Sequence, residues 1–283
     1  MNKIIIGTML LLLIAACSHT YTETTDSPPS YKYPEQKENK HENKGKIENN
    51  EENEKDVLNM HEEEKEVPLV PLYRVDEHSW TIVPIADANE KVVLLTIDDA
   101  PDQYTLEMAN ILKELDVKAI FFVNGHFLDT EEEQNVLKEI HQLGFEIGNH
   151  TYSHSMLSKL SPEKQKEEIV RLNNLIENII GERPKFFRAP FGVNTEISKE
   201  IVRQEGMQLM NWTYGYDWEK EYRTKEALEH IMVDTPLLRN GANLLMHDRE
   251  WTKEALRNIV LGLQEKGYEI IDPALIATPQ PNQ

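Results

Sequence analysis

Several polar residues in this chain have side chains that could bind a metal ion or transfer protons, and each group follows a short apolar run. In chain order they are Asp98 and Asp99, His150 and His154, Arg188, Asp217 with Trp218, and His247. In folds built from parallel strands and helices, functional residues gather at the carboxyl ends of the strands. We therefore expect these groups to face one site.

The pair of histidines is the strongest indication of a metal site. His150 and His154 are four residues apart, which is the spacing of two imidazoles on one face of a helical turn. Imidazole nitrogens with one carboxylate suit zinc, cobalt or a similar divalent ion and leave coordination positions open. Asp98 and Asp99 would repel each other unless a cation compensates, although a turn or helix-capping role explains this pair equally well when it is taken alone.

The elements that must position these residues alternate between strands and helices. The expected strands span 92–97, 119–123, 145–147, 186–187, 208–212, 243–246 and 268–271, and the expected helices span 106–115, 131–143, 162–180, 196–204, 225–233 and 252–266. This alternation predicts an α/β fold with a parallel sheet. About seven parallel strands suit a distorted, incomplete (β/α) barrel, but the periodicity does not separate that fold from an open doubly wound sheet.

The first 66 residues differ from the rest of the chain. Lys3 precedes an apolar run at 4–14 that is too short to span a bilayer and is typical of a signal peptide. Small residues then precede Cys17, the single cysteine, so residues 1–17 resemble a bacterial lipoprotein signal with Cys17 as the lipidated residue. Residues 18–66 are rich in charge and poor in apolar side chains, which predicts a disordered tether. Residues 67–90 are expected to form a lead-in strand or a hairpin.

The composition excludes several classes of function. The formal net charge of -20 makes nucleic acid an unfavourable partner, because the phosphate backbone would be repelled. One cysteine excludes an internal disulfide framework and a cysteine-rich zinc site. The chain has neither a Walker loop nor a G-x-G-x-x-G segment, so a nucleotide has no support as a ligand.

Five short motifs resemble those of the polysaccharide deacetylase family, also called the NodB-homology domain or carbohydrate esterase family 4. They are TIDDAP at 96–101, HTYSH at 150–154, RAPFG at 188–192, DW at 217–218 and LMH at 245–247. The similarity covers roughly Lys91 to Asp272, and we assign residues 91–283 to this domain. The resemblance implies a distorted β/α barrel and metal-dependent removal of N-acetyl groups from β-1,4-linked N-acetylhexosamine polymers.

The resemblance also implies a role for each residue on the metal-binding side of the site. Asp99, His150 and His154 would hold the metal ion. Asp98 would be the general base that takes a proton from the attacking water. Arg188 would orient Asp98 and keep it ionised through a bidentate contact.

On the opposite side, the resemblance makes His247 the general acid that protonates the departing sugar amine. The backbone N–H of Phe191 would stabilise the oxyanion, and Trp218 and Leu245 would form the wall around the acetyl methyl group. Asp217 belongs to the same catalytic set.

Departures from the family pattern predict lower activity or altered substrate choice. Family members usually carry Phe and Gly where this chain has Ile97 and Ala100, and the alanine matters if that position requires a positive φ. The family commonly has a further Asp three residues before the Asp-Trp pair, where this chain has Tyr214. Either another group, with Asp217 and Asp248 as candidates, tunes His247, or the pKa of His247 is raised less than in the family.

The leading hypothesis is a lipid-anchored enzyme on the extracytoplasmic face of a bacterial membrane, which deacetylates N-acetylglucosamine in peptidoglycan with zinc, or cobalt in its place. N-acetylmuramic acid and chitin-like oligomers are further candidate substrates. One alternative is an esterase that removes O-acetyl groups from xylan. Another is a glycan-binding wall lipoprotein with little or no activity.

Overall fold

The computed structural model describes residues 70–279, so the assignments for residues 1–66, including the lipidation of Cys17, lie outside the described residues. The described part begins with an antiparallel hairpin of β1 (Tyr73–Val75) and β2 (Ile82–Pro84). The strands that follow are β3 (Val92–Ala100), β4 (Ile120–Val123), β5 (Glu146–Asn149), β6 (Phe186–Phe187), β7 (Gln208–Leu209), β8 (Ala242–His247) and β9 (Glu269–Ile270). In residues 70–279, no helix has the length and apolar character needed to cross a membrane.

These seven strands form one parallel sheet that curls into an incomplete barrel. The strand order is β7-β6-β5-β4-β3-β8, and β9 pairs with the beginning of β3. Beyond β7, Tyr214 forms a parallel bridge with Leu244 of β8, and the Thr213 N–H donates to the Asn243 carbonyl at 2.9 Å. The chain that leaves β7 thus meets the strand at the other edge. The prediction of a distorted barrel with about seven parallel strands is confirmed, and the open sheet is not formed.

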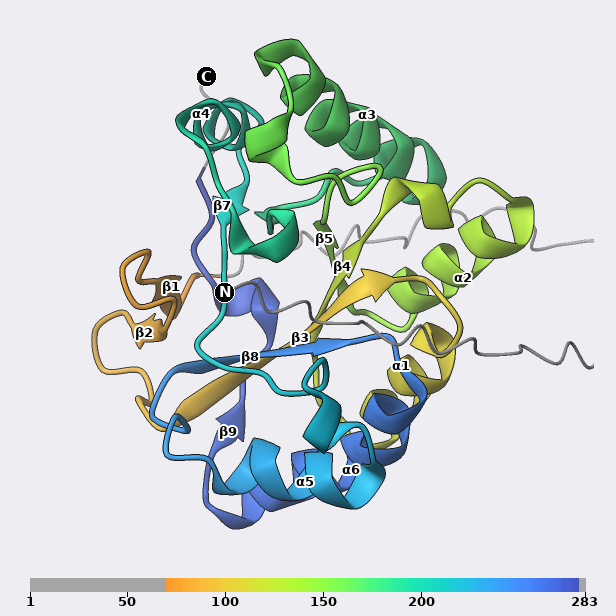
Figure 1. The fold of residues 1–283 in the computed structure, drawn as a ribbon. Coiled ribbons are helices and arrows are strands. Elements are labelled where there is room, and N and C mark those ends of the chain that lie inside the picture. Colours follow the sequence, from red (N-terminus) through yellow and green to blue (C-terminus); the bar gives the residue numbers. More distant parts are fainter. Residues whose placement is uncertain (1–69, 280–283) are drawn as a thin grey trace, which may run out of the picture. The chain divides into compact units, whose positions relative to one another are not determined.

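Helices cover the outer face of this sheet (Figure 1). They are α1 (Thr105–Glu114), α2 (Glu131–Gln142), α3 (Pro162–Ile180), α4 (Glu196–Gln204), α5 (Lys225–Asp234) and α6 (Glu250–Glu265). The helix α3 shows how closely local sequence sets the bounds. Ser161 caps its first turn by accepting the Lys164 N–H, Pro162 is its first residue, and Gly181 ends it with a φ of 81°.

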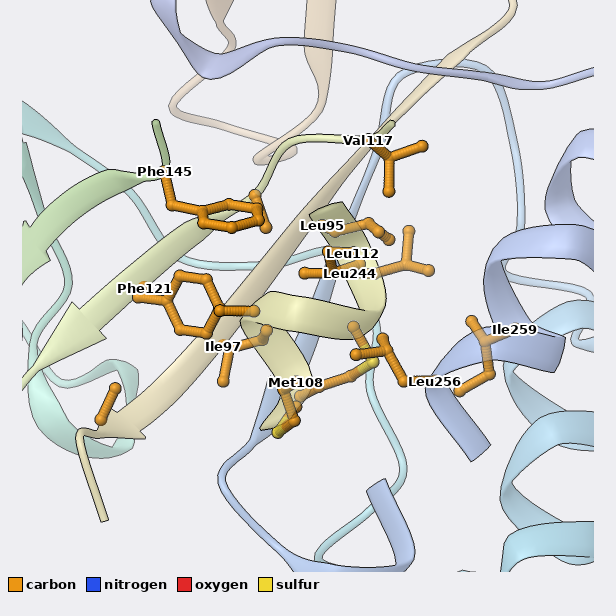
Figure 2. Packing of buried hydrophobic residues seen from close by; sticks show 14 of the residues in the cluster. Leu95, Ile97, Met108, Leu112, Val117, Phe121, Phe145, Leu244, Leu256 and Ile259 are labelled. Carbon is orange, nitrogen blue, oxygen red and sulfur yellow. The ribbon is translucent and has the colours of Figure 1, made fainter. Parts of the chain in front are cut away.

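The alternation of side chains along β3 divides the core into an outer and an inner layer. Leu95 and Ile97 point outward and pack against α1 and α6, as Figure 2 shows. Val92 and Leu94 point inward, where they meet apolar residues of β4 and of the β1–β2 hairpin. Because successive strand residues face opposite sides, Asp98 continues the inward series and emerges inside the barrel.

Candidate active site

Nine of the ten candidate site residues predicted within the domain line one cavity of about 520 Å³ at the carboxyl ends of the strands. They are Asp98, Asp99, His150, His154, Phe191, Asp217, Trp218, Leu245 and His247. Arg188 is the exception, because its side chain is fully buried against Asp98. The expectation that the polar groups converge on one site therefore agrees with the geometry.

Asp98 and Asp99 both face the cavity, although neighbours in a regular strand point to opposite sides. The register of β3 against β4 shifts between Ile97 and Ala100, and Asp99 has a φ of 61° in the left-handed region. This local rotation brings the second carboxylate to the side of the first. Ala100 is not among the left-handed residues, so alanine causes no backbone strain at this position.

Asp99, His150 and His154 form a group that could hold a metal ion. One candidate ligand atom from each lies within 4.8 Å of the others, and Nε2 of His154 is 3.5 Å from Oδ1 of Asp99. Nδ1 of His150 donates to the Arg188 carbonyl at 2.7 Å, which leaves the lone pair of Nε2 toward the group. Two imidazole nitrogens and one carboxylate fit a divalent ion such as zinc and leave coordination positions open.

The two histidines lie on a loop, so the prediction of a helical turn is wrong. The segment follows β5, and Thr151 and His154 have positive φ values of 69° and 55°. Asn149 holds the loop, because its Oδ1 accepts the Thr151 N–H at 2.8 Å and its Nδ2 donates to Asn173 at 2.7 Å. The path of the loop, rather than a helical period, brings the two ring centres to 5.0 Å.

Burial and neighbouring charge prepare two of these residues for metal binding. Burial alone would raise the pKa of Asp99, but the charges of His247, His150, His154 and Arg249 lower it overall. Burial, together with the charge of His150, lowers the pKa of His154. Metal ligands must be an ionised carboxylate and a neutral imidazole. Both groups are therefore in their binding form near neutral pH.

Arg188 holds Asp98 through a single nitrogen, so the predicted bidentate contact is wrong. Its Nη1 donates to Oδ1 of Asp98 at 2.6 Å and to the Thr96 hydroxyl at 2.8 Å, whereas Nη2 donates to the Asn211 carbonyl at 2.9 Å. The second oxygen of Asp98 stays 3.5 Å from Nε2 of His150. Arg188 therefore occupies one oxygen of Asp98 and leaves the other beside the candidate metal site.

His247 is held by Asp217, which is 1% exposed. Nδ1 of His247 donates to one carboxylate oxygen at 2.8 Å, and the other oxygen accepts the His247 backbone N–H at 2.6 Å and the Thr252 hydroxyl at 2.9 Å. Burial by itself would lower the pKa of His247, but Asp217, with the charges of Asp98 and Asp99, raises it. A divalent ion nearby would act against this rise.

The departures around Tyr214 do not leave His247 without a carboxylate. Tyr214 is buried in the core, and its hydroxyl donates to a backbone carbonyl of α5 at 2.8 Å. Asp248 accepts hydrogen bonds from Asp102, Tyr104 and Thr105, at and just before the start of α1. Of the two carboxylates named from the sequence, Asp217 is the one in contact with the imidazole.

Three apolar side chains complete the walls. The Trp218 ring centre lies 5.6 Å from that of His247, and Leu245 is buried beneath the cavity. Phe191 has a φ of 60° and places its ring centre 5.0 Å from that of His154, with the side chain exposed.

Four further residues that were not predicted from the sequence line the same cavity, namely Trp212, Arg223, Arg249 and Trp251. Nη2 of Arg249 donates to the second oxygen of Asp99 at 2.8 Å. Arg249 and Trp251 lie at the start of α6, close behind the end of β8, so their position near a strand end could have indicated the site. Nothing in the spacing of Arg223 indicates the site.

Comparisons with known proteins agree with this fold and site. The polysaccharide deacetylase family matches residues 86–210. The chain is 33% identical over 201 residues to a peptidoglycan-N-acetylglucosamine deacetylase of Bacillus cereus, covering 67% of this chain and 70% of that protein. It is 32% identical over 170 residues to the uncharacterized protein YlxY of Bacillus subtilis, covering 60% of this chain but about half of YlxY, 51%.

Among solved structures, a CE4 family pseudoenzyme from Bacillus anthracis is 30% identical, with a TM-score of 0.59 and coverage of 64% of this chain and 63% of that chain. A mutant of this pseudoenzyme is described as having restored enzymatic activity. From the fold, the candidate metal site and these similarities, the chain belongs to the polysaccharide deacetylase family.

Proposed function

We propose that this protein is a metal-dependent hydrolase that removes N-acetyl groups from amino sugars of cell-wall peptidoglycan, with N-acetylglucosamine as the first candidate. The observation that carries the proposal is the convergence of Asp99, His150 and His154 beside Asp98, with His247 lining the same cavity. The relative from Bacillus cereus, which is named for this activity, supports the substrate class.

In this proposal the residues of one wall deliver the attacking water. Asp99, His150 and His154 hold the ion, which when bound supplies Lewis-acid polarisation of the acetyl oxygen and lowers the pKa of water. Asp98 takes the proton of the attacking water through Oδ2, the oxygen that Arg188 does not bind. The Phe191 N–H is the candidate donor to the oxygen that gains charge.

The residues of the opposite wall release the amine. An amine anion is a very poor leaving group near neutral pH, so the C–N bond breaks only if a proton reaches the nitrogen. Asp217 fixes Nδ1 of His247, which leaves Nε2 to donate that proton. Trp218 and Leu245 are the candidate walls for the acetyl methyl group.

The decisive experiment measures acetate release from glycan strands and N-acetylglucosamine oligomers by the full chain loaded with zinc or cobalt. Asp98→Asn should lose at least about a hundredfold in kcat/KM and keep its metal. His150→Ala should lose both metal and activity. The proposal fails if the loaded protein releases no acetate, or if Asp98→Asn is as active as the wild type.

Two alternatives make different predictions in the same assay. An O-acetyl esterase would release acetate from acetylated xylan, and it would depend less on His247 because an alkoxide leaves more easily than an amine anion. A glycan-binding protein without turnover is favoured by the pseudoenzyme among the structural relatives. It would bind the strands with the same affinity with and without Asp98→Asn.

We further propose that Cys17 is lipidated and anchors the chain to the extracytoplasmic face of the membrane. The support is the apolar run at 4–14 followed by small residues and this single cysteine. Cys17→Ser should move the protein from the membrane fraction to the medium. An unchanged membrane fraction would contradict the anchor.

A further inference from the structure

Two arginines line the cavity from two separate elements. Arg223 follows the short helical turn at Lys220–Tyr222, and its Nη2 donates to the Trp218 carbonyl at 2.6 Å. Its guanidinium lies 5.8 Å from the centre of the Trp251 ring. Within residues 70–279, no carboxylate forms an ion pair with Arg223 at 4.0 Å or less, so its charge is available to a ligand.

Arg249 reaches the cavity from the beginning of α6. Its Nη2 donates to Asp99 at 2.8 Å and its Nη1 to the Asp248 carbonyl at 2.7 Å, which fixes the guanidinium on the wall. The side chain is nevertheless 37% exposed. One face of a positioned cation therefore remains open to whatever fills the cavity.

The charges of the cavity do not cancel. Asp98 is paired with Arg188, Asp217 with His247, and Asp99 with Arg249, while Arg223 adds a positive charge without an acidic partner among the described residues. A divalent ion held by the histidines would add further positive charge. When His247 is protonated, as the proposed general acid must be, the cavity is cationic in a chain whose net charge is -20, and such a cavity attracts an anionic ligand.

The hollow next to the cavity carries negative rather than positive charge. The adjoining hollow shares Arg223 and Trp251 with the cavity, but it is also lined by Glu226, Glu250 and Glu254. An anionic group placed in that hollow would be repelled. An anionic group is favoured only close to the reacting amide.

We propose that Arg223 and Arg249 bind a carboxylate carried by the sugar whose acetamido group reacts, or by the sugar next to it. The preferred substrates are then acidic amino-sugar glycans rather than neutral chitin-like ones. This inference rests on the proposed deacetylase function. In peptidoglycan the carboxylate has two sources, namely the lactyl group of a peptide-free muramic acid and the peptide attached to that lactyl group.

The test compares three probes, which are peptide-free glycan strands, peptide-bearing strands and chitin oligomers of equal length. We expect kcat/KM for one of the acidic probes to exceed that for chitin oligomers by about tenfold or more. Arg223→Gln and Arg249→Gln should each reduce this ratio by about three- to tenfold, and Arg223→Lys should retain most of it. Arg203→Gln on α4, an exposed arginine paired with Glu200, is the matched control and should leave the ratio unchanged.

The same comparison is made by calorimetric binding to Asp98→Asn, with metal content measured for every variant because Arg249 contacts Asp99. A preference for peptide-free strands identifies the lactyl carboxylate, and a preference for peptide-bearing strands identifies the peptide. Equal kcat/KM and equal affinity for acidic and neutral probes would overturn the inference, as would a preference that survives the double arginine variant. If no probe releases acetate, the proposed function fails, while the binding data still decide this inference.

Discussion

The two sides of the cavity are built in different ways. On the metal side (Asp99, His150 and His154), left-handed backbone conformations at Asp99 and His154 and a loop held by Asn149 aim the ligand atoms. On the acid side (Asp217 and His247), a regular strand ends in the imidazole, and a buried carboxylate orients it. The geometry of the metal side therefore depends on the path of the backbone, whereas that of the acid side depends on one pair of side chains. Substitutions on the metal side should change zinc affinity, and substitutions on the acid side should change the pH profile of kcat/KM.

The largest effect expected on the acid side alone comes from His247→Asn. Loss of a general acid should lower kcat/KM for glycan deacetylation by about 10²–10⁴. The zinc affinity, measured by calorimetry, should stay close to that of the wild type. A variant that loses its metal as well would show that the two sides are not separate.

Asp217→Asn should act through the protonation of His247. Because Asp217 raises the pKa of His247, its neutralisation lowers that pKa, and the alkaline limb of the pH profile of kcat/KM should move to lower pH. The loss at neutral pH should be about ten- to a hundredfold, since a hydrogen bond to a charged group contributes about 1.5–3 kcal/mol. If the alkaline limb of the pH profile does not move, another group sets the pKa of the general acid.

Asn149→Ala should damage the metal side without touching a ligand. The substitution removes the acceptor for the Thr151 N–H and the contact with Asn173, so the free energy of unfolding should fall by about 1–3 kcal/mol. Zinc affinity should fall about tenfold while the pH profile of the metal-loaded protein keeps its shape. Asn135→Ala, on the exposed surface of α2, is the control. A shifted alkaline limb would contradict the division between the two sides.

Glu146→Gln tests the pH dependence of stability at the start of β5, away from the histidines that follow the end of this strand. Burial raises the pKa of Glu146 to about 7, against the opposing charge of Lys185 at 3.9 Å. The folded state therefore binds this proton more tightly than the unfolded state, and stability falls as pH rises from about 4.5 to about 7. Glu146→Gln should be more stable than the wild type at pH 8 by up to about 3 kcal/mol, with a much smaller difference at pH 5.

Urea unfolding at the two pH values checks this expectation. Activity and zinc affinity should not change, because Glu146 lies at the start of β5 and the histidines follow its end. An activity profile that moved with this variant would mean that the pH dependence assigned to His247 has a second source.

Much of the fold was predictable because it is encoded locally. The bounds of α3 follow from Ser161, Pro162 and Gly181, and the predicted 162–180 span agrees with the structure. The strand predicted at 208–212 ends at Leu209, because the chain then turns toward β8, and that pairing depends on residues 30 positions away. Long-range pairing leaves no local pattern in the sequence.

The site was predictable in its members and less so in its geometry. The candidate site residues converge on one cavity, but the left-handed conformations of Thr151 and His154 occur without glycine. The four-residue spacing therefore predicts a helical turn where the structure has a loop. The contact between Arg249 and Asp99 joins residues separated by 150 positions, and no spacing rule indicates it. The single-nitrogen contact of Arg188 likewise depends on Asn211 drawing the other nitrogen away.

The bridge between Tyr214 and Leu244 has a consequence for catalysis that reaches beyond the fold. This bridge closes the barrel between the chain after β7 and β8, and we call this junction the seam. Asp217 and His247 lie on opposite sides of the seam, three residues after Tyr214 and Leu244 respectively. Opening of this seam would stretch the carboxylate–imidazole pair, because its two members lie on opposite sides of it. The metal ligands lie on or after β3 and β5, which belong to the continuous sheet on one side of the seam. A looser barrel would therefore be detected as a change in the pH at which His247 loses its proton.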